Sequence, residues 1–126
     1  MNEPYWLSRE VILTVHDSLL SRFGGRGGIR GSGMLDSALN KPIQLFTYGK
    51  PSLFDLAAAY AAGIIGNHPF GDGNKRSGFM AAYVFLGING HRLNAPEEQA
   101  VLQTLALAAG EIGADEYAVW LKASVQ

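Results

Sequence analysis

Apolar residues recur three or four positions apart along most of the chain. This spacing puts them on one face of an α-helix, and it predicts helices over about residues 9–23, 33–40, 95–109 and 115–124. Two further segments, residues 53–67 and 79–88, are apolar nearly all round, which is typical of helices that are buried on every side. The pattern therefore predicts an all-α fold of about six helices, with those two segments at its centre.

Polar residues mark the expected starts of these helices. Ser8 and Ser52 are predicted N-caps, and Asp55 completes a capping box with Ser52. Asn94 is the predicted cap of the helix that follows it, with Glu97 three residues later. The residues of that helix expected to point inward are Val101, Leu102, Leu105 and Leu107.

Two segments lack a clear helical pattern. The glycine-rich residues 24–33 follow no evident strand and lack the spacing of a nucleotide-binding P-loop, so a flexible connector is favoured over a phosphate-binding loop. Pro42 disfavours a helix that continues past about residue 40. For residues 43–48, a short strand and an irregular flap both remain open.

Length, charge and composition narrow the class of protein. A chain of 126 residues predicts a single domain over residues 1–126. A net charge of −1 and a pI of about 6.3 argue against direct contact with nucleic acid or a charged membrane surface. No apolar run reaches the ~18 residues of a membrane span, and without cysteine the chain has no disulfide or thiol nucleophile. We therefore expect a cytoplasmic protein without membrane contact.

The densest group of chemically active side chains lies between the two buried segments. The second of these helices is predicted to start near Asn74, so its first amides lack partners and favour an anion. Gly71 and Gly73 have no Cβ and can take positive φ, which lets neighbouring N–H groups turn toward such an anion. Lys75 and Arg76 lie in the first turn, where cations oppose the helix dipole unless an anion binds between them. This arrangement predicts a phosphate site.

Asp72 and His68 add a metal ligand and a base to this phosphate site. A carboxylate beside bound phosphates is the usual arrangement for Mg²⁺, and an imidazole suits a general base near neutral pH. Together these groups predict transfer from a nucleoside triphosphate to a hydroxyl. The candidate site residues are His68, Gly71, Asp72, Gly73, Asn74, Lys75 and Arg76.

These side chains also have structural interpretations. His68 is placed to end a helix, and Asn74 either to cap the next helix or to fix the loop. Arg76 is able to pair with Asp55 or another carboxylate. The functional interpretation is favoured because so many active groups coincide in one short stretch.

The loop resembles the signature of the Fic/Doc superfamily, in particular its death-on-curing (Doc) branch of toxins from toxin–antitoxin systems. The matching string is His68-Pro69-Phe70-x-Asp72-Gly73-Asn74-Lys75-Arg76, where x is any residue, and weaker matches along the chain include Val15-His16-Asp17. The resemblance implies an all-α Fic fold with this loop between its two central helices. The roles it implies are general base for His68, loop anchor for Phe70, Mg²⁺ ligand for Asp72, anion hole for Gly73 and Asn74, and contact with the phosphates of ATP for Lys75 and Arg76.

Two positions bear on the expected reaction. Adenylylating members of the superfamily carry a glycine where this chain has Lys75 and an arginine where it has Phe79. In the Doc branch the lysine turns the nucleotide round, so the resemblance implies transfer of the γ-phosphate to a protein hydroxyl. In family members that hydroxyl is a threonine of elongation factor Tu, and translation stops. The alternatives are a protein adenylyltransferase and a non-catalytic module that docks an antitoxin or DNA.

The resemblance also implies a partner. The inhibitory helix of the family carries a glutamate followed by glycine or asparagine, and no glutamate of this chain is followed by either. We therefore expect a separate antitoxin whose helical segment lies in a hydrophobic groove of this protein. Residues 43–48 are a candidate flap for holding the target peptide, and a merely packed loop is the equal alternative.

Overall fold

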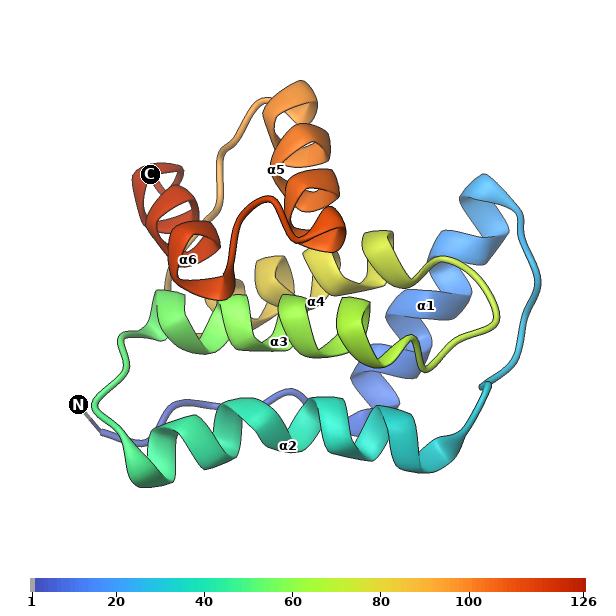
Figure 1. Ribbon diagram of the computed structural model, residues 1–126, viewed down its shortest axis with the longest axis horizontal. Coiled ribbons are helices and arrows are strands. Elements are labelled where there is room, and N and C mark those ends of the chain that lie inside the picture. The colour runs from blue at the N-terminus through green and yellow to red at the C-terminus, as the bar shows by residue number, and fades with distance from the viewer. Residues whose placement is uncertain (1) are drawn as a thin grey trace.

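Six helices make up the computed structural model, which describes residues 2–126, and this part of the chain contains no β-strand (Figure 1). In chain order they are α1 (Arg9–Phe23), α2 (Ser32–Tyr48), α3 (Leu53–Asn67), α4 (Asn74–Ile88), α5 (Glu97–Ala109) and α6 (Ala114–Ala123). The predicted all-α fold is therefore confirmed. None of these helices is long and apolar enough to cross a lipid bilayer.

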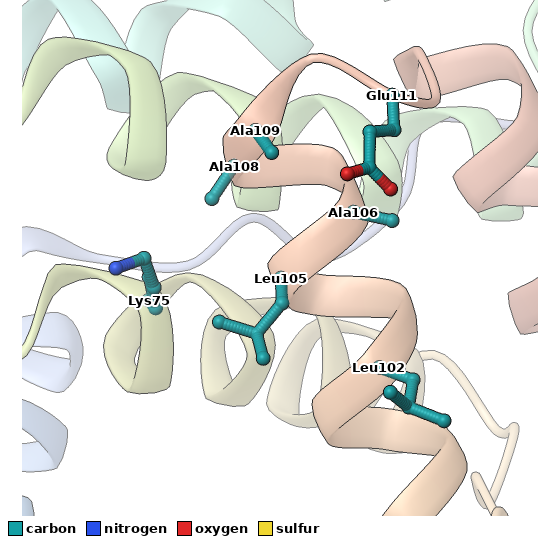
Figure 2. Close-up of a pocket in the computed structure, with 7 residues that line it drawn as sticks. All are labelled: Lys75, Leu102, Leu105, Ala106, Ala108, Ala109 and Glu111. Atoms are coloured by element: carbon teal, nitrogen blue, oxygen red, sulfur yellow. The ribbon is translucent and has the colours of Figure 1, made fainter.

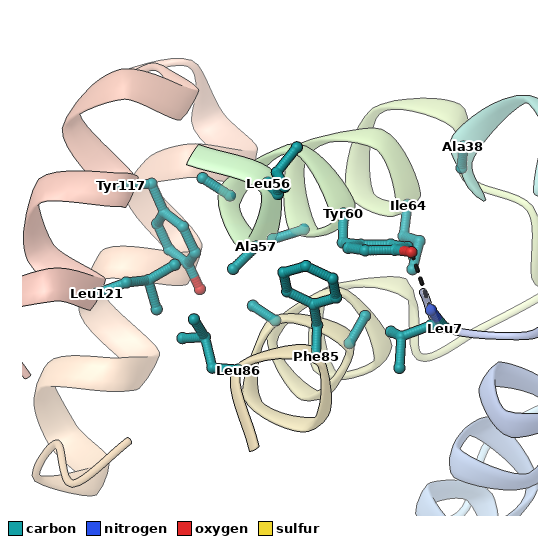
Figure 3. Packing of buried hydrophobic residues seen from close by; sticks show 14 of the residues in the cluster. Leu7, Ala38, Leu56, Ala57, Tyr60, Ile64, Phe85, Leu86, Tyr117 and Leu121 are labelled. Atoms are coloured by element: carbon teal, nitrogen blue, oxygen red, sulfur yellow. Dashed lines mark hydrogen bonds between the residues drawn. The ribbon is translucent and has the colours of Figure 1, made fainter. Parts of the chain in front are cut away.

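Helix α3 lies at the centre of the molecule and contacts α2, α4, α5 and α6. In Figure 1, α2 runs along one side of α3, while α5 and α6 lie on the opposite side. Helix α1 packs against α4. Large, fully buried side chains of the shared core, all drawn in Figure 3, include Leu56, Tyr60, Ile64, Phe85, Leu86, Tyr117 and Leu121.

The predicted starts of α1 and α3 are confirmed by their capping contacts. The Ser8 hydroxyl accepts a hydrogen bond from the Val11 amide at 3.2 Å. At α3, the Ser52 hydroxyl accepts from the Asp55 amide at 3.1 Å, and the Asp55 carboxylate accepts from the Ser52 amide at 2.8 Å. This capping box satisfies backbone groups that would otherwise lack partners, and it fixes where α3 begins.

Helix α2 continues through Pro42 to Tyr48, so the prediction that residues 43–48 form a strand or a flap is wrong. A proline inside a helix removes one backbone donor and costs about 3 kcal/mol. The Pro42 side chain is fully buried, however, and beyond it Phe46 packs edge-on against Trp6 with ring centroids 5.6 Å apart. These apolar contacts keep the segment helical because they offset the missing hydrogen bond.

The start of α5 also differs from the prediction. The helix begins at Glu97, with Pro96 in the N-cap position and no side-chain cap. Asn94 lies outside the helix because its amide donates to the Ser124 carbonyl at 2.7 Å, which ties this segment to the end of the chain.

The inward face of α5 is built around a polar residue. Thr104 is buried, and its hydroxyl forms a hydrogen bond with the Tyr117 hydroxyl at 2.8 Å. With Thr104 facing the core, the neighbouring apolar residues turn toward solvent. Leu107 packs against the core as predicted. The prediction is wrong for Val101, Leu102 and Leu105, which are 51%, 65% and 47% exposed.

Small residues let the central helices approach closely, as the alanines of α3 suggest. A Cβ on Gly78 of α4 would lie 3.1 Å from the Ala61 carbonyl oxygen and 2.8 Å from a side-chain carbon of Ile65, both in α3. A Cβ on Gly63 of α3 would lie 3.2 Å from the Ala38 carbonyl oxygen of α2. Backbone thus packs against backbone on both sides of α3.

Replacing Gly78 by alanine is expected to destabilise the protein by about 1–3 kcal/mol, because the new methyl group overpacks the contact between α3 and α4. Gly87→Ala in the same helix is the matched control, since nothing lies within 4 Å of the position its Cβ would take. That change is expected to stabilise the protein by up to ~1 kcal/mol through helix propensity. Urea unfolding measures both, and equal effects would contradict the close contact.

Two buried tyrosines are expected to make the fold sensitive to alkali. Burial raises the pKa of Tyr60 and of Tyr117 from 10.0 to about 12. Between pH 10 and 12 the unfolded chain loses these tyrosine protons while the folded protein keeps them. The contribution of each tyrosine to the free energy of unfolding is therefore complete below pH ~10 and is lost as the pH rises through about 12. We expect the free energy of unfolding to fall by up to about 1.4 kcal/mol per pH unit for each tyrosine in that range.

Urea unfolding at a series of pH values on both sides of ~10 measures this slope. Tyr60→Phe and Tyr117→Phe should each reduce it. Tyr48→Phe is the control, because the Tyr48 side chain is 87% exposed. A slope that stays unchanged in both buried-site variants would contradict the assignment.

Candidate active site

His68 ends α3 and begins the loop of residues 68–73 that leads to α4 (Figure 1). Its backbone takes the left-handed conformation, with φ 53° and ψ 54°, and its amide donates to the Ile64 carbonyl at 3.0 Å. Among residues 2–126 it is the only residue other than glycine with positive φ. The imidazole is exposed, so the structural role of ending the helix leaves the side chain free to meet a ligand.

Asn74 fixes the loop with its side chain. Its Oδ1 accepts a hydrogen bond from the Phe70 amide at 3.0 Å, and its Nδ2 donates to the Phe70 carbonyl at 3.1 Å. Both residues are buried, and the Phe70 ring belongs to the core. Of the two structural interpretations of Asn74, fixing the loop is confirmed and capping the helix is wrong. The N-cap residue of α4 is Gly73.

The first turn of α4 presents amides without acceptors. Gly73 has φ 79°, as predicted, whereas Gly71 has no positive φ, so that expectation is wrong. The Ser77 amide is the first of the helix to donate backward, to the Gly73 carbonyl at 2.9 Å. Within residues 2–126, no hydrogen bond is made by the amides of Asn74, Lys75 or Arg76. Three adjacent free amides at the positive end of a helix dipole are a candidate site for an anion.

The two cations of this turn are exposed. The guanidinium carbon of Arg76 lies 4.3 Å from the ring centroid of Phe23, at the end of α1. Pairing of Arg76 with Asp55 is wrong, because Asp55 serves in the capping box of α3 and no ion pair of Arg76 forms in the described part of the chain. Lys75 and Arg76 therefore remain available to an anion.

Asp72 supplies one carboxylate beside the free amides. Its Oδ1 accepts a hydrogen bond from the Gly73 amide at 2.9 Å, and the residue is exposed. No group of three or more metal-ligating side chains occurs within residues 2–126. A lone carboxylate fits a Mg²⁺ that takes its other ligands from phosphates and water, and it does not fit a metal held by protein alone.

The glycine-rich segment between α1 and α2 lies against the loop. The Arg30 amide donates to the Pro69 carbonyl at 2.7 Å, and the Gly71 amide donates to the Gly28 carbonyl at 3.2 Å. These contacts form an antiparallel bridge between Ile29 and Phe70. The expectation of a flexible connector is therefore wrong for the part of the segment that pairs with the loop.

His16 of α1 also belongs to the loop environment, although the sequence showed it only as part of a weak family match. It is 2% exposed, and its Nε2 lies 2.8 Å from the Asp72 carbonyl oxygen. Its ring is stacked on the Phe70 ring. The signal available in the sequence was its position four residues after Ile12, which puts both on the inner face of α1.

An open pocket of about 500 Å³ adjoins Lys75 on the surface formed by α4 and α5 (Figure 2). Its other lining residues are Leu102, Leu105, Ala106, Ala108, Ala109 and Glu111. The exposed leucines of α5 thus lie beside one cation of the candidate anion site.

The sequence model of the Fic/DOC family matches residues 6–86, which include the whole loop. The chain belongs to the Fic/DOC family. A protein of Mycolicibacterium smegmatis named Toxin Doc is 42% identical to it over 93 residues, which cover 71% of this chain and 68% of that one. A protein of Escherichia phage P1 named Protein kinase doc is 31% identical over 117 residues, 92% of each chain. The family resemblance of the loop is thereby confirmed.

The left-handed conformation of His68 leads to a stability prediction. A residue with a Cβ costs about 1–2 kcal/mol more than glycine in this conformation. We expect His68→Gly to be about 1 kcal/mol more stable than His68→Ala. The reverse change at Gly110, which has φ 76° and open space around it, is the control: Gly110→Ala should destabilise by a similar amount. Urea unfolding measures all three, and equal stability of the two His68 variants would contradict strain at this position.

Proposed function

We propose that this protein transfers the γ-phosphate of ATP to a hydroxyl of a target protein, and that it acts as a toxin in the cytoplasm. The observation that carries the proposal is the first turn of α4, where three free amides stand beside two exposed cations. Cations at this end of a helix are repelled by the positive end of its dipole. A bound anion would offset this repulsion and accept hydrogen bonds from the free amides. The similarity to the proteins named Toxin Doc and Protein kinase doc supports a Doc-type activity.

His68 is the proposed general base. Its exposed imidazole takes the proton from the acceptor hydroxyl as the oxygen attacks the γ-phosphorus. The bond between that phosphorus and the oxygen bridging to the β-phosphate breaks, and ADP leaves with the electron pair. In-line transfer of this kind depends mostly on positioning and charge stabilisation.

The remaining loop residues hold the nucleotide. The amides of the first turn and the side chains of Lys75 and Arg76 bind its phosphates, and the backbone of Gly71 and Gly73 lets the chain pass close to them. Asp72 would hold Mg²⁺, which when bound offsets negative charge on the phosphates.

Lys75 is the residue on which the choice of phosphate depends. Adenylylating members of the superfamily have glycine at this position and an arginine where this chain has Phe79. With a lysine beside the free amides, the nucleotide is turned so that its γ-phosphate faces the acceptor. The proposed reaction is therefore phosphorylation, with adenylylation as the alternative outcome.

The proposed target is a threonine of elongation factor Tu, as implied by the family, and phosphorylation would arrest translation. A separate antitoxin would neutralise the protein, with a helical segment in a hydrophobic groove. Because residues 43–48 are helical, we propose residues 28–30, where Ile29 bridges to Phe70 of the loop, in their place as the segment that holds the target peptide.

Labelled ATP tests the proposal directly. The purified protein, Mg²⁺ and elongation factor Tu are incubated with ATP labelled at either the α- or the γ-phosphate. We expect label from the γ-position only. His68→Ala should lower the rate by about 10²–10⁴-fold, and Lys75→Ala by at least ~10-fold. Lys122→Ala, which removes an exposed lysine of α6, should leave it unchanged.

Each other outcome has a definite meaning. Label from the α-position would overturn the kinase in favour of an adenylyltransferase. No label from either position, together with normal growth of cells that express the protein, would leave a non-catalytic module that docks a partner. Full activity of His68→Ala would remove the imidazole from the mechanism.

A further inference from the structure

We infer that His16 is a positioning residue of this active site, which sets the direction of the peptide between Asp72 and Gly73. The inference rests on the proposed function for its effect on rate. The contact that carries it lies between Nε2 of His16 and the Asp72 carbonyl oxygen, which are 2.8 Å apart. Because a carbonyl oxygen only accepts, Nε2 carries the proton and donates it.

A stacking contact with Phe70 also fixes the ring of His16. It lies nearly parallel to the Phe70 ring, with centroids 3.8 Å apart and 7° between the planes. Phe70 is fully buried, and the Asn74 side chain holds its backbone on both sides. The imidazole therefore stands on a rigid surface and presents its N–H group to the loop in one direction.

Fixing the Asp72 carbonyl also fixes the Gly73 amide. The C=O and N–H groups of a trans peptide point in opposite directions, so a carbonyl turned toward α1 turns the Gly73 N–H away from it. That N–H donates to Asp72 Oδ1 at 2.9 Å and so holds the proposed Mg²⁺ ligand. A Cβ on Gly73 would lie 3.6 Å from His16 Nε2, so the histidine also lies against the N-cap residue of α4.

A histidine that served only to fill the core would be replaceable by another flat ring. His16→Phe keeps the stack on Phe70 and loses the donor, whereas His16→Gln keeps an N–H donor at a similar reach and loses the ring. The two variants therefore separate positioning from packing. His91→Phe is the matched control, because His91 lies edge-on to Phe54 and takes no part in the loop.

Two readouts are needed, one of which is independent of catalysis. The first is hydrogen exchange of the loop amides, measured by NMR on the ligand-free protein. His16→Phe is expected to raise the exchange rate of the Gly73 amide by at least ~10-fold, since loss of a neutral hydrogen bond of about 1.4 kcal/mol corresponds to that factor. His16→Gln should restore most of the protection, and His91→Phe should leave it unchanged.

The second readout is the rate of γ-phosphate transfer. His16→Phe is expected to lower kcat by at least ~10-fold at a thermal midpoint close to that of the wild type, and His16→Gln to recover most of the loss. A His16→Phe variant that matches the wild type in exchange and in rate would overturn the inference. Loss of protection and of rate in His16→Gln, with His16→Phe unchanged, would assign His16 a packing role and overturn the inference equally.

The exchange measurement keeps this inference separate from the proposed function. A wild-type protein that transfers no phosphate would refute the proposed kinase activity. The exchange rates of the Gly73 amide in the two His16 variants would still decide whether His16 orients the peptide between Asp72 and Gly73. A protein that transfers phosphate while His16→Phe shows unaltered exchange and rate would refute the positioning role alone.

Discussion

The backbone contact between α3 and α4 is the constraint on which the loop depends. Gly78 has no side chain, so its turn of α4 lies directly against the Ala61 carbonyl of α3. Once two helices approach this closely, their neighbouring ends have a fixed separation. The chain must reverse within residues 68–73, and it does so with left-handed residues at both ends of the loop, His68 and Gly73. The conformation of the signature loop is therefore imposed by packing beneath it.

Within that span, the loop's polar groups are divided into two sets. The backbone groups on its inner side have partners from three directions: the Asn74 side chain, the segment before α2 and His16 of α1. Buried backbone groups require such partners, because an unpaired one costs about as much as a lost hydrogen bond. In the described part of the chain, the amides left over are that of Asp72 and those of the first turn of α4. Because the backbone groups on the inner side of the loop have hydrogen-bond partners, the donors without partners lie together where an anion is proposed to bind.

The sequence predicts what depends on local spacing. The two central helices, the capping box at Ser52 and the grouping of His68 to Arg76 follow from residues within one or two turns of each other. The family followed from the same short string, and its match over residues 6–86 bears that out.

What the sequence missed depends on contacts between distant parts of the chain. His16 and Asp72 are far apart in sequence, and no periodic pattern links them. The pairing of Ile29 with Phe70 is hidden for the same reason. The prediction that the helix ends before Pro42 is wrong because burial of the proline ring outweighs its local preference against a helix. The prediction for the inward face of α5 is wrong because the buried Thr104 hydroxyl has a partner in the core.

The stacking of Arg76 on Phe23 has a consequence for conformational entropy. A free arginine side chain samples many rotamers, and immobilising it costs up to about 2 kcal/mol. Here the guanidinium already rests on a ring supplied by the end of α1. Much of that ordering is complete in the ligand-free protein, so binding of the proposed phosphate at this turn would lose less freedom than it would with an unsupported side chain. An aromatic residue outside the signature thereby restricts the rotamers of the arginine within it.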